Sequence, residues 1–198
     1  MLLFFEVNQL YISLAVLGVA LLGLWVQGRS LSYLFFCAVF GIYLIGVVTV
    51  VVFPIHIPEA DIEFNPELRL NLVPFNFGRC DFLFLCLRNI YENILLTVPF
   101  GFGISFIARL KSKHFLWLAI LIGIIFEATQ LIISLVFRSS FRAVDINDVI
   151  LNAIGVLLGY GIFRIFGWLY LYITQRFEIS NKYVFAYIYE AVRHSTER

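Results

Sequence analysis

The chain has 198 residues, of which 62% are hydrophobic and only 14% are charged, and its mean hydropathy is +0.94. So few charged residues cannot cover the surface of a soluble protein of this size, which excludes a soluble fold and predicts an integral membrane protein. The formal net charge of +1 gives no indication of binding to nucleic acid.

Five apolar stretches are long enough to predict transmembrane helices, because about 20 helical residues cross the hydrocarbon core of a bilayer. Their ranges are 10–26, 31–53, 93–108, 115–137 and 146–173. The third is short and contains Pro99, which predicts a kink or local unwinding. We therefore expect an all-α polytopic membrane bundle of five transmembrane helices, forming a single membrane domain over residues 1–198.

Two other segments are expected at the membrane surface. Residues 71–86 are apolar but are interrupted by Pro74 and Gly78, so they predict a re-entrant or interfacial segment before the third span. Residues 181–193 mix aromatic and charged side chains, which is typical of a helix lying on the membrane. Cys80 and Cys86 are spaced to permit a disulfide, and the sequence leaves open whether they form one.

Basic residues in the short loops predict the orientation in the membrane. They follow the first span (Arg29), the third span (Arg109, Lys111, Lys113) and the fifth span (Arg176, Lys182). Basic loops favour the cytoplasmic side, so we predict that the C-terminus is cytoplasmic. The N-terminus, the long acidic loop over residues 55–92 and the hairpin between spans four and five then face outward.

Polar side chains are concentrated around this hairpin. On a helix, Glu127 and Gln130 share one face, and Asp145, Asp148 and Asn152 share another. Counted from the outer helix ends at 1.5 Å per residue, Gln130 and Asn152 are expected at about 10 Å and about 9 Å depth, and Glu127 at about 15 Å, near the middle of the bilayer. The pattern predicts an outward-opening polar pocket. Its lining residues would be Asn93, Glu127, Gln130, Arg138, Arg142, Asp145, Asp148 and Asn152.

Other interpretations of this pattern stay open. The same side chains can hydrogen-bond across helices and simply hold the bundle together, although an ionisable residue inside the membrane, such as Glu127, favours a function. Three carboxylates could bind a divalent cation, but no histidine or fourth carboxylate lies nearby, so no metal or cofactor is predicted. Gly155 and Gly159 form a small-xxx-small face, for which packing within the chain is the expected use.

Several motifs follow one another in a set order over residues 40–173. They are Asn71-Leu-Val-Pro-Phe75, Asn93-Ile-Leu-Leu, Pro99-Phe-Gly101, Glu127-Ala-Thr-Gln130, Arg138, and Asp145-Ile-Asn-Asp148 with Asn152, Gly155 and Gly159. As a set they resemble the VanZ family. The spacer from Arg138 to Asp145 is longer than the Arg-x-x-Asp pattern of the family, which Arg142 matches better. The tail over residues 174–198 lies outside the resemblance.

The resemblance implies a multi-pass protein of the bacterial plasma membrane that lowers susceptibility to teicoplanin-type glycopeptide antibiotics, and it implies no established reaction. The polar pocket suggests contact with a lipid-linked peptidoglycan precursor or a lipoglycopeptide at the outer face. One alternative is a membrane hydrolase or transferase acting on a lipid phosphate, with Glu127, Asp145 or Asp148 as general base. Another is a small proton-coupled transporter. The sequence does not indicate the oligomeric state.

Overall fold

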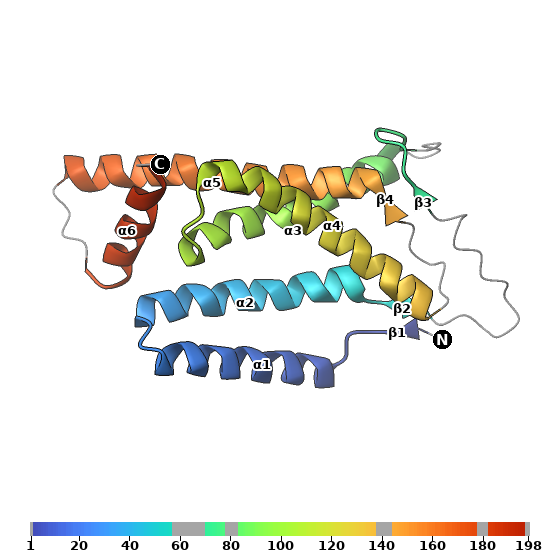
Figure 1. Ribbon diagram of the computed structural model, residues 1–198, viewed down its shortest axis with the longest axis horizontal. Coiled ribbons are helices and arrows are strands. Elements are labelled where there is room, and N and C mark those ends of the chain that lie inside the picture. The colour runs from blue at the N-terminus through green and yellow to red at the C-terminus, as the bar shows by residue number, and fades with distance from the viewer. Residues whose placement is uncertain (1, 57–69, 78–82, 138–143, 178–181, 197–198) are drawn as a thin grey trace, which may run out of the picture.

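The computed structural model describes residues 2–56, 70–77, 83–137, 144–177 and 182–196. The described helices are α1 (Val7–Val26), α2 (Leu31–Val52), α3 (Leu83–Ile107), α4 (Ser112–Val136), α5 (Ile146–Arg176) and α6 (Val184–Thr196). Figure 1 shows the first five running roughly along the long axis of the molecule. All five are long and apolar enough to cross a membrane, which confirms the predicted all-α membrane bundle.

Four short strands lie together at one end of this bundle, which we call the strand end (Figure 1). Strand β1 (Leu2–Leu3) pairs antiparallel with β2 (Ile55–His56), and β3 (Leu70–Asn71) pairs parallel with β4 (Val144–Asp145). At the opposite end, which we call the α6 end, lie α6 and the connections between α1 and α2 and between α3 and α4.

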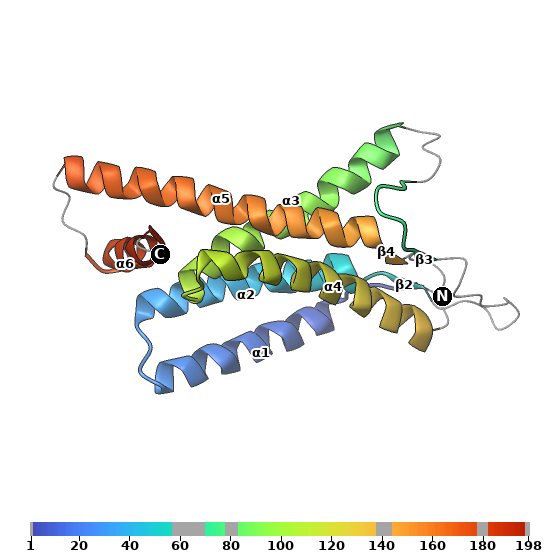
Figure 2. The ribbon, with the colours of Figure 1, turned by 45° about the horizontal axis from the view of Figure 1, so that its top comes forward.

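The centre of the bundle is the contact between α3 and α5, the most extensive in the molecule. Figure 2 shows these two helices crossing. Three glycines allow their backbones to touch: a Cβ atom added to Gly101 would lie 2.0 Å from the Val156 carbonyl oxygen, and one added to Gly159 would lie 2.0 Å from that of Val98. At Gly155 it would lie 2.1 Å from Oγ1 of Thr97. The expected use of the glycine face within the chain is therefore confirmed.

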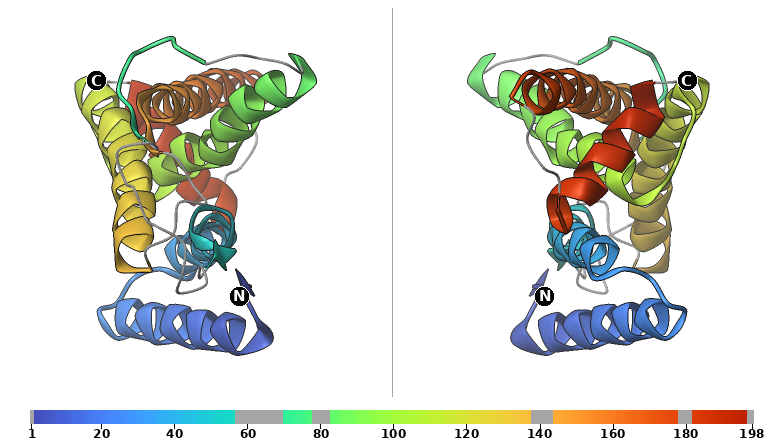
Figure 3. Two further views of the ribbon diagram at one scale, coloured as in Figure 1. Left: turned by 90° about the vertical axis from the view of Figure 1, so that its right-hand side faces the viewer. Right: turned by 90° about the vertical axis from the view of Figure 1, so that its left-hand side faces the viewer.

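Helix α1 is peripheral to this centre. None of its residues is buried, and the helix it packs against is α2. Figure 3 shows α1 at the edge of the bundle, below α2. Since α1 is apolar along its whole length, its exposed side chains require lipid rather than water around them.

Helix α6 lies across the end of the bundle, as expected for the C-terminal segment (Figure 3). Its Val192 is fully buried against Phe106 and Phe163. The hydroxyl of Tyr187 donates a hydrogen bond to the Phe106 carbonyl oxygen, and Nη1 of Arg164 donates to the Ser195 carbonyl oxygen at 2.9 Å. This helix is thus fixed to α3 and α5 and closes one end of the bundle.

Helix α3 begins ten residues earlier than the sequence predicts. The predicted helix start at residue 93 was wrong, because hydropathy identifies only the most apolar part of the helix. The helix itself continues outward through polar residues. The guanidinium of Arg88 contacts the Glu92 carboxylate at 2.7 Å, a pairing that supports one further turn. Residues 83–86 of the predicted re-entrant or interfacial segment are thus helical, and residues 70–77 lie at the strand end. The helix runs unbroken through Pro99, without the local unwinding considered above.

Candidate functional site

The strand end brings together seven polar side chains, which we call the polar cluster. They come from the loop that carries β3 and from α3, α4, β4 and α5, and are Asn71, Asn89, Asn93, Glu127, Asp145, Asn147 and Asp148. Four of them, Asn93, Glu127, Asp145 and Asp148, are predicted site residues. Each contact of the cluster involves either Asp145, at the end of β4, or the first turn of α5.

Asp145 caps the amino end of α5. One of its carboxylate oxygens accepts a hydrogen bond from the backbone N–H of Asn147 at 2.8 Å, and Nδ2 of Asn71 lies 3.0 Å from each oxygen. Its own backbone N–H donates to Oε2 of Glu127 at 3.0 Å. Glu127 is only 4% exposed, so this carboxylate joins α4 to the start of α5 inside the protein. The negative charge of Asp145 is also favoured by the dipole of α5.

Asn147 holds the loop that follows β3. It is 2% exposed, and its side-chain oxygen accepts a hydrogen bond from the Phe75 backbone N–H at 2.6 Å. Its Nδ2 donates to the Asn76 carbonyl oxygen at 3.0 Å. Phe75 has a φ of 63°, a left-handed conformation that costs a residue with a side chain on the order of 1 kcal/mol or more. Asn147 therefore stabilises a strained backbone that leaves the ring of Phe75 75% exposed.

Asp148 joins α5 to α3. Its Oδ1 accepts hydrogen bonds from Nδ2 of Asn93 at 2.9 Å and from Nδ2 of Asn89 at 3.1 Å. Asn89 is exposed, and Asn93 and Asp148 are half-buried. This part of the polar cluster is therefore accessible from outside the bundle, in contrast to Glu127 and Asn147.

The predicted depths of the polar residues were wrong. The contact between Glu127 and Asp145 places Glu127 level with the first residues of α5, and a Cβ on Gly123 would lie 2.5 Å from the Val149 carbonyl oxygen, in the same register. Helix α4 thus extends outward past the start of α5, whereas the prediction set the outer ends of the two helices at one level. On this register Asn152 lies about 10 Å further into the bundle than Glu127, and Gln130 lies one turn further out.

Gln130 and Asn152 are therefore not partners. Gln130 is half-buried, and its side chain makes no hydrogen bond with another described residue. Asn152 is 1% exposed between α3 and α5, where its carbonyl oxygen accepts a hydrogen bond from Oγ1 of Thr97 at 2.8 Å. Its side-chain Oδ1 is buried with no hydrogen-bond partner among the described residues. Asn152 thus belongs to the helix interface and not to the polar cluster.

Some predicted residues lie outside the described ranges. Arg138 and Arg142 are among them, as is Cys80, so the assignment of the arginine and the question of a disulfide keep their status as predictions. Within the described ranges, no group of three or more histidine, cysteine, aspartate or glutamate side chains is placed to hold a metal ion.

Three members of the polar cluster were not predicted as site residues. Asn71 and Asn147 both stand inside motifs that carry the family resemblance, so a role could have been assigned to them on that ground. Asn89 stands four residues before Asn93, on the same helical face, but it fell in the segment predicted as loop. Asn89 was missed because the sequence did not predict that α3 extends outward beyond residue 93.

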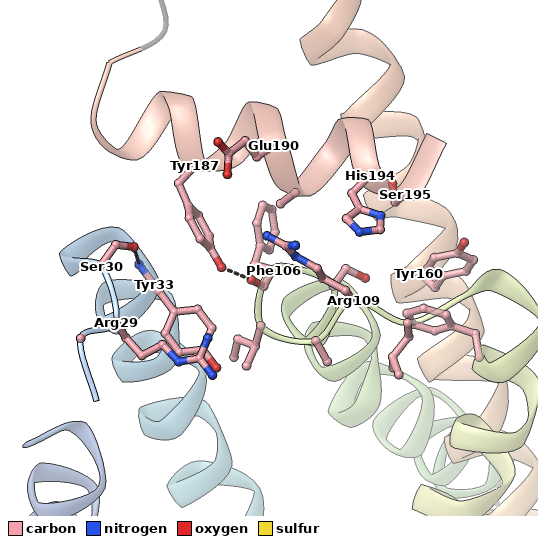
Figure 4. Close-up of a pocket in the computed structure, with 17 residues that line it drawn as sticks. Arg29, Ser30, Tyr33, Phe106, Arg109, Tyr160, Tyr187, Glu190, His194 and Ser195 are labelled. Atoms are coloured by element: carbon pink, nitrogen blue, oxygen red, sulfur yellow. Dashed lines mark hydrogen bonds between the residues drawn. The ribbon is translucent and has the colours of Figure 1, made fainter. Parts of the chain in front are cut away.

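A cavity of about 520 Å³ lies at the α6 end, opposite the polar cluster. It is formed by α6, by the connection between α1 and α2, and by the connection between α3 and α4. Figure 4 shows the side chains that line it. Arg29, Arg109 and His194 supply cationic or titratable groups, and Tyr33, Tyr160 and Tyr187 supply aromatic hydroxyls. This cavity was not predicted from the sequence, because its residues come from distant segments that carry no shared motif. The outward pocket predicted at the polar cluster stays a prediction.

Five long apolar helices in one bundle define a multi-pass helical membrane protein. The VanZ/LLP1 family model matches residues 40–173, which is more than half of the chain. The chain therefore belongs to the VanZ/LLP1 family, and the matched region extends from the middle of α2 almost to the end of α5. No curated protein and no solved structure matched the chain.

Proposed function

We propose that the strand end acts at the outer face of the bacterial plasma membrane, where it binds an amphiphile of the cell wall and thereby lowers susceptibility to teicoplanin-type glycopeptides. The ligand class is a lipid-linked peptidoglycan precursor or a lipoglycopeptide. The supporting observation is that the accessible part of the polar cluster adjoins a loop with exposed apolar side chains. Leu72, Val73 and Phe75 are 68%, 59% and 75% exposed.

This arrangement suits a ligand that has a polar head and an apolar chain. Asn89, Asn93 and Asp148 offer amide and carboxylate groups, which hydrogen-bond to the hydroxyl and amide groups of sugars and peptides. The exposed loop side chains offer a surface for an acyl or prenyl chain. The strained backbone of Phe75 is compatible with this proposal, because strained residues cluster at functional sites such as ligand clamps.

The alternatives have less support. A general base needs an available carboxylate. That of Asp145 accepts hydrogen bonds as a helix cap and that of Glu127 accepts one from the Asp145 backbone, so Asp148, on the accessible side of the cluster, is the carboxylate that this alternative would use. A proton-coupled transporter was suggested by a carboxylate near mid-membrane and a broken third helix. Glu127 instead lies level with the start of α5, and α3 is continuous.

The proposal is tested by expressing the full chain in a glycopeptide-susceptible bacterium and measuring the inhibitory concentrations of teicoplanin and vancomycin. We expect the unaltered chain to raise the teicoplanin value. The double variant Asn89→Ala, Phe75→Ala should lose most of this protection, because it removes one exposed group from each half of the surface. Equal protection by this variant at equal membrane abundance would contradict the proposal.

A matched control is Phe185→Ala, which removes the same kind of side chain, 62% exposed, at the α6 end. We expect it to leave protection unchanged. Cell-wall precursors extracted with the purified protein give a second measurement: they should be enriched with the unaltered chain and with Phe185→Ala, and depleted with the double variant.

A further inference from the structure

The α6 end is strongly cationic. Its described basic residues are Arg29, Arg109, Lys111, Lys113, Arg164, Arg176, Lys182 and Arg193, whereas Glu190 is the described acid there. Arg29 and Arg109 of this set line the cavity of about 520 Å³ at the same end. The potential at the mouth of the cavity therefore favours an anion.

Two of these cations line the cavity without an ion pair to any described residue. They are Arg29, in the connection between α1 and α2, and Arg109, which follows α3. The guanidinium carbon of Arg29 lies 5.4 Å from the centre of the Tyr33 ring, a cation–π contact that orients the group without neutralising it. In Figure 4 the side chain of Arg109 reaches toward α6. Guanidinium groups suit phosphate oxygens because they offer several N–H donors in one plane.

The walls of the cavity combine polar and apolar surface. Ser30, Ser195 and three tyrosines supply hydroxyl groups, whereas Phe106 and Phe115 are buried and close its inner side. The cavity lies beside the ends of α1, α2 and α3, where helices that cross a membrane are expected to reach the lipid headgroups. Tyrosine and arginine are the side chains favoured at that level, and basic pockets between helices there bind phosphate-bearing headgroups.

We propose that this cavity binds the phosphate-bearing headgroup of an anionic lipid, with Arg29 and Arg109 as the phosphate ligands. The cavity is larger than a phosphate group, and its hydroxyl and apolar walls accommodate the part of the lipid next to the phosphate. Glu190 faces the same space and opposes the binding of an anion. The proposal concerns the end opposite the polar cluster and does not depend on the function proposed for that cluster.

The experiment uses the full chain in nanodiscs of phosphatidylcholine that contain a minor share of phosphatidic acid. Native mass spectrometry measures the amount of each lipid retained after the disc is removed. We expect preferential retention of phosphatidic acid, reduced about tenfold by Arg109→Gln and further by the Arg29→Gln, Arg109→Gln double variant, because each charged hydrogen-bonding group contributes at least that factor. Arg109→Lys should give an intermediate value, since it keeps the charge and loses the planar donors.

Matched variants separate a site from general surface charge. Lys113→Gln removes a cation of the same end that does not line the cavity, so it should leave the preference nearly unchanged. Glu190→Gln removes the opposing charge and should strengthen retention. An equal loss with Lys113→Gln and Arg109→Gln would overturn the proposal, as would full retention by the double variant. Circular dichroism and size-exclusion profiles show whether each variant is folded.

A soluble competitor distinguishes the lipid from a free phosphate compound. Glycerol 3-phosphate carries the same headgroup chemistry without acyl chains. If the lipid is the ligand, this compound should displace little phosphatidic acid at equal concentration. Full displacement under that condition would overturn the assignment to a lipid.

Discussion

At the strand end, Asn147 and Asp145 are hydrogen-bonded to neighbouring segments, whereas at the α6 end Arg29 and Arg109 line open space and form no ion pair with a described residue. The buried part of the strand end and the cavity at the α6 end thus use polar side chains in opposite ways. Buried polar groups that are bonded to one another determine how the helices and loops are joined. Charged groups around a cavity are available for a ligand. A polar side chain in an apolar chain must therefore be judged by its partners before it is called a binding residue.

The largest effect on stability is expected for Asn147→Ala, which tests whether the strand end is held by its buried amide. The change leaves the Phe75 backbone N–H without its acceptor and removes two further hydrogen bonds. We expect a loss of about 2 kcal/mol in the free energy of unfolding, measured by denaturation in mixed micelles. Asn89→Ala is the control, because Asn89 is exposed and Asp148 keeps its bond from Asn93. A loss no larger than that of the control would show that Asn147 does not hold the loop.

A smaller effect is expected for Tyr187→Phe, which tests how α6 is attached. The variant loses the hydrogen bond to the Phe106 carbonyl oxygen, so unfolding of α6 should be easier by about 1 kcal/mol. Burial, and to a lesser degree Tyr33 and Cys37, raises the pKa of Tyr187 to about 12 from the ordinary 10.0. Because the folded state holds this proton more tightly, the contribution of Tyr187 is complete below pH 10 and is lost as the pH rises toward 12.

Hydrogen exchange of the α6 amides measures both effects. The unaltered protein should lose protection in this alkaline range, and Tyr187→Phe should show less dependence on pH there. An identical pH dependence in the two proteins would contradict the role given to the Tyr187 hydroxyl.

The smallest effect on stability is expected for Arg109→Gln. Since Arg109 is exposed and has no ion pair with a described residue, its replacement should change the free energy of unfolding by no more than about 0.5 kcal/mol. The same denaturation measurement applies. A loss comparable to that of Asn147→Ala would remove the contrast between the two ends, because Arg109 would then also be part of the architecture.

The sequence predicted the five long helices well, because their apolar runs are a direct consequence of the solvent that surrounds them. Their ends were harder to predict. The helix α3 begins at Leu83 because polar residues such as Arg88 and Glu92 form helix outside the hydrocarbon region, where hydropathy carries no signal. An error of this kind placed Asn89 in a loop.

The candidate site was predicted in part. The motif around Asp145 and Asp148 led to the polar cluster, since residues three apart on a helix share a face. The depths were wrong because the relative register of α4 and α5 depends on packing, such as the contact of Gly123 with Val149, and not on the length of the hairpin. The cavity at the α6 end was not predicted, because Arg29, Arg109 and His194 are brought together only by the fold.

The close contact of α3 with α5 has a mechanical consequence for both ends. With carbonyl oxygens against Gly101 and Gly159, neither helix can slide along the other without a backbone collision. The two helices therefore form one stiff unit. It carries Asn93 and Asp148 at the strand end, and Phe106 and Tyr160 at the α6 end. Movement of either helix at one end of the bundle is therefore expected to move both helices together.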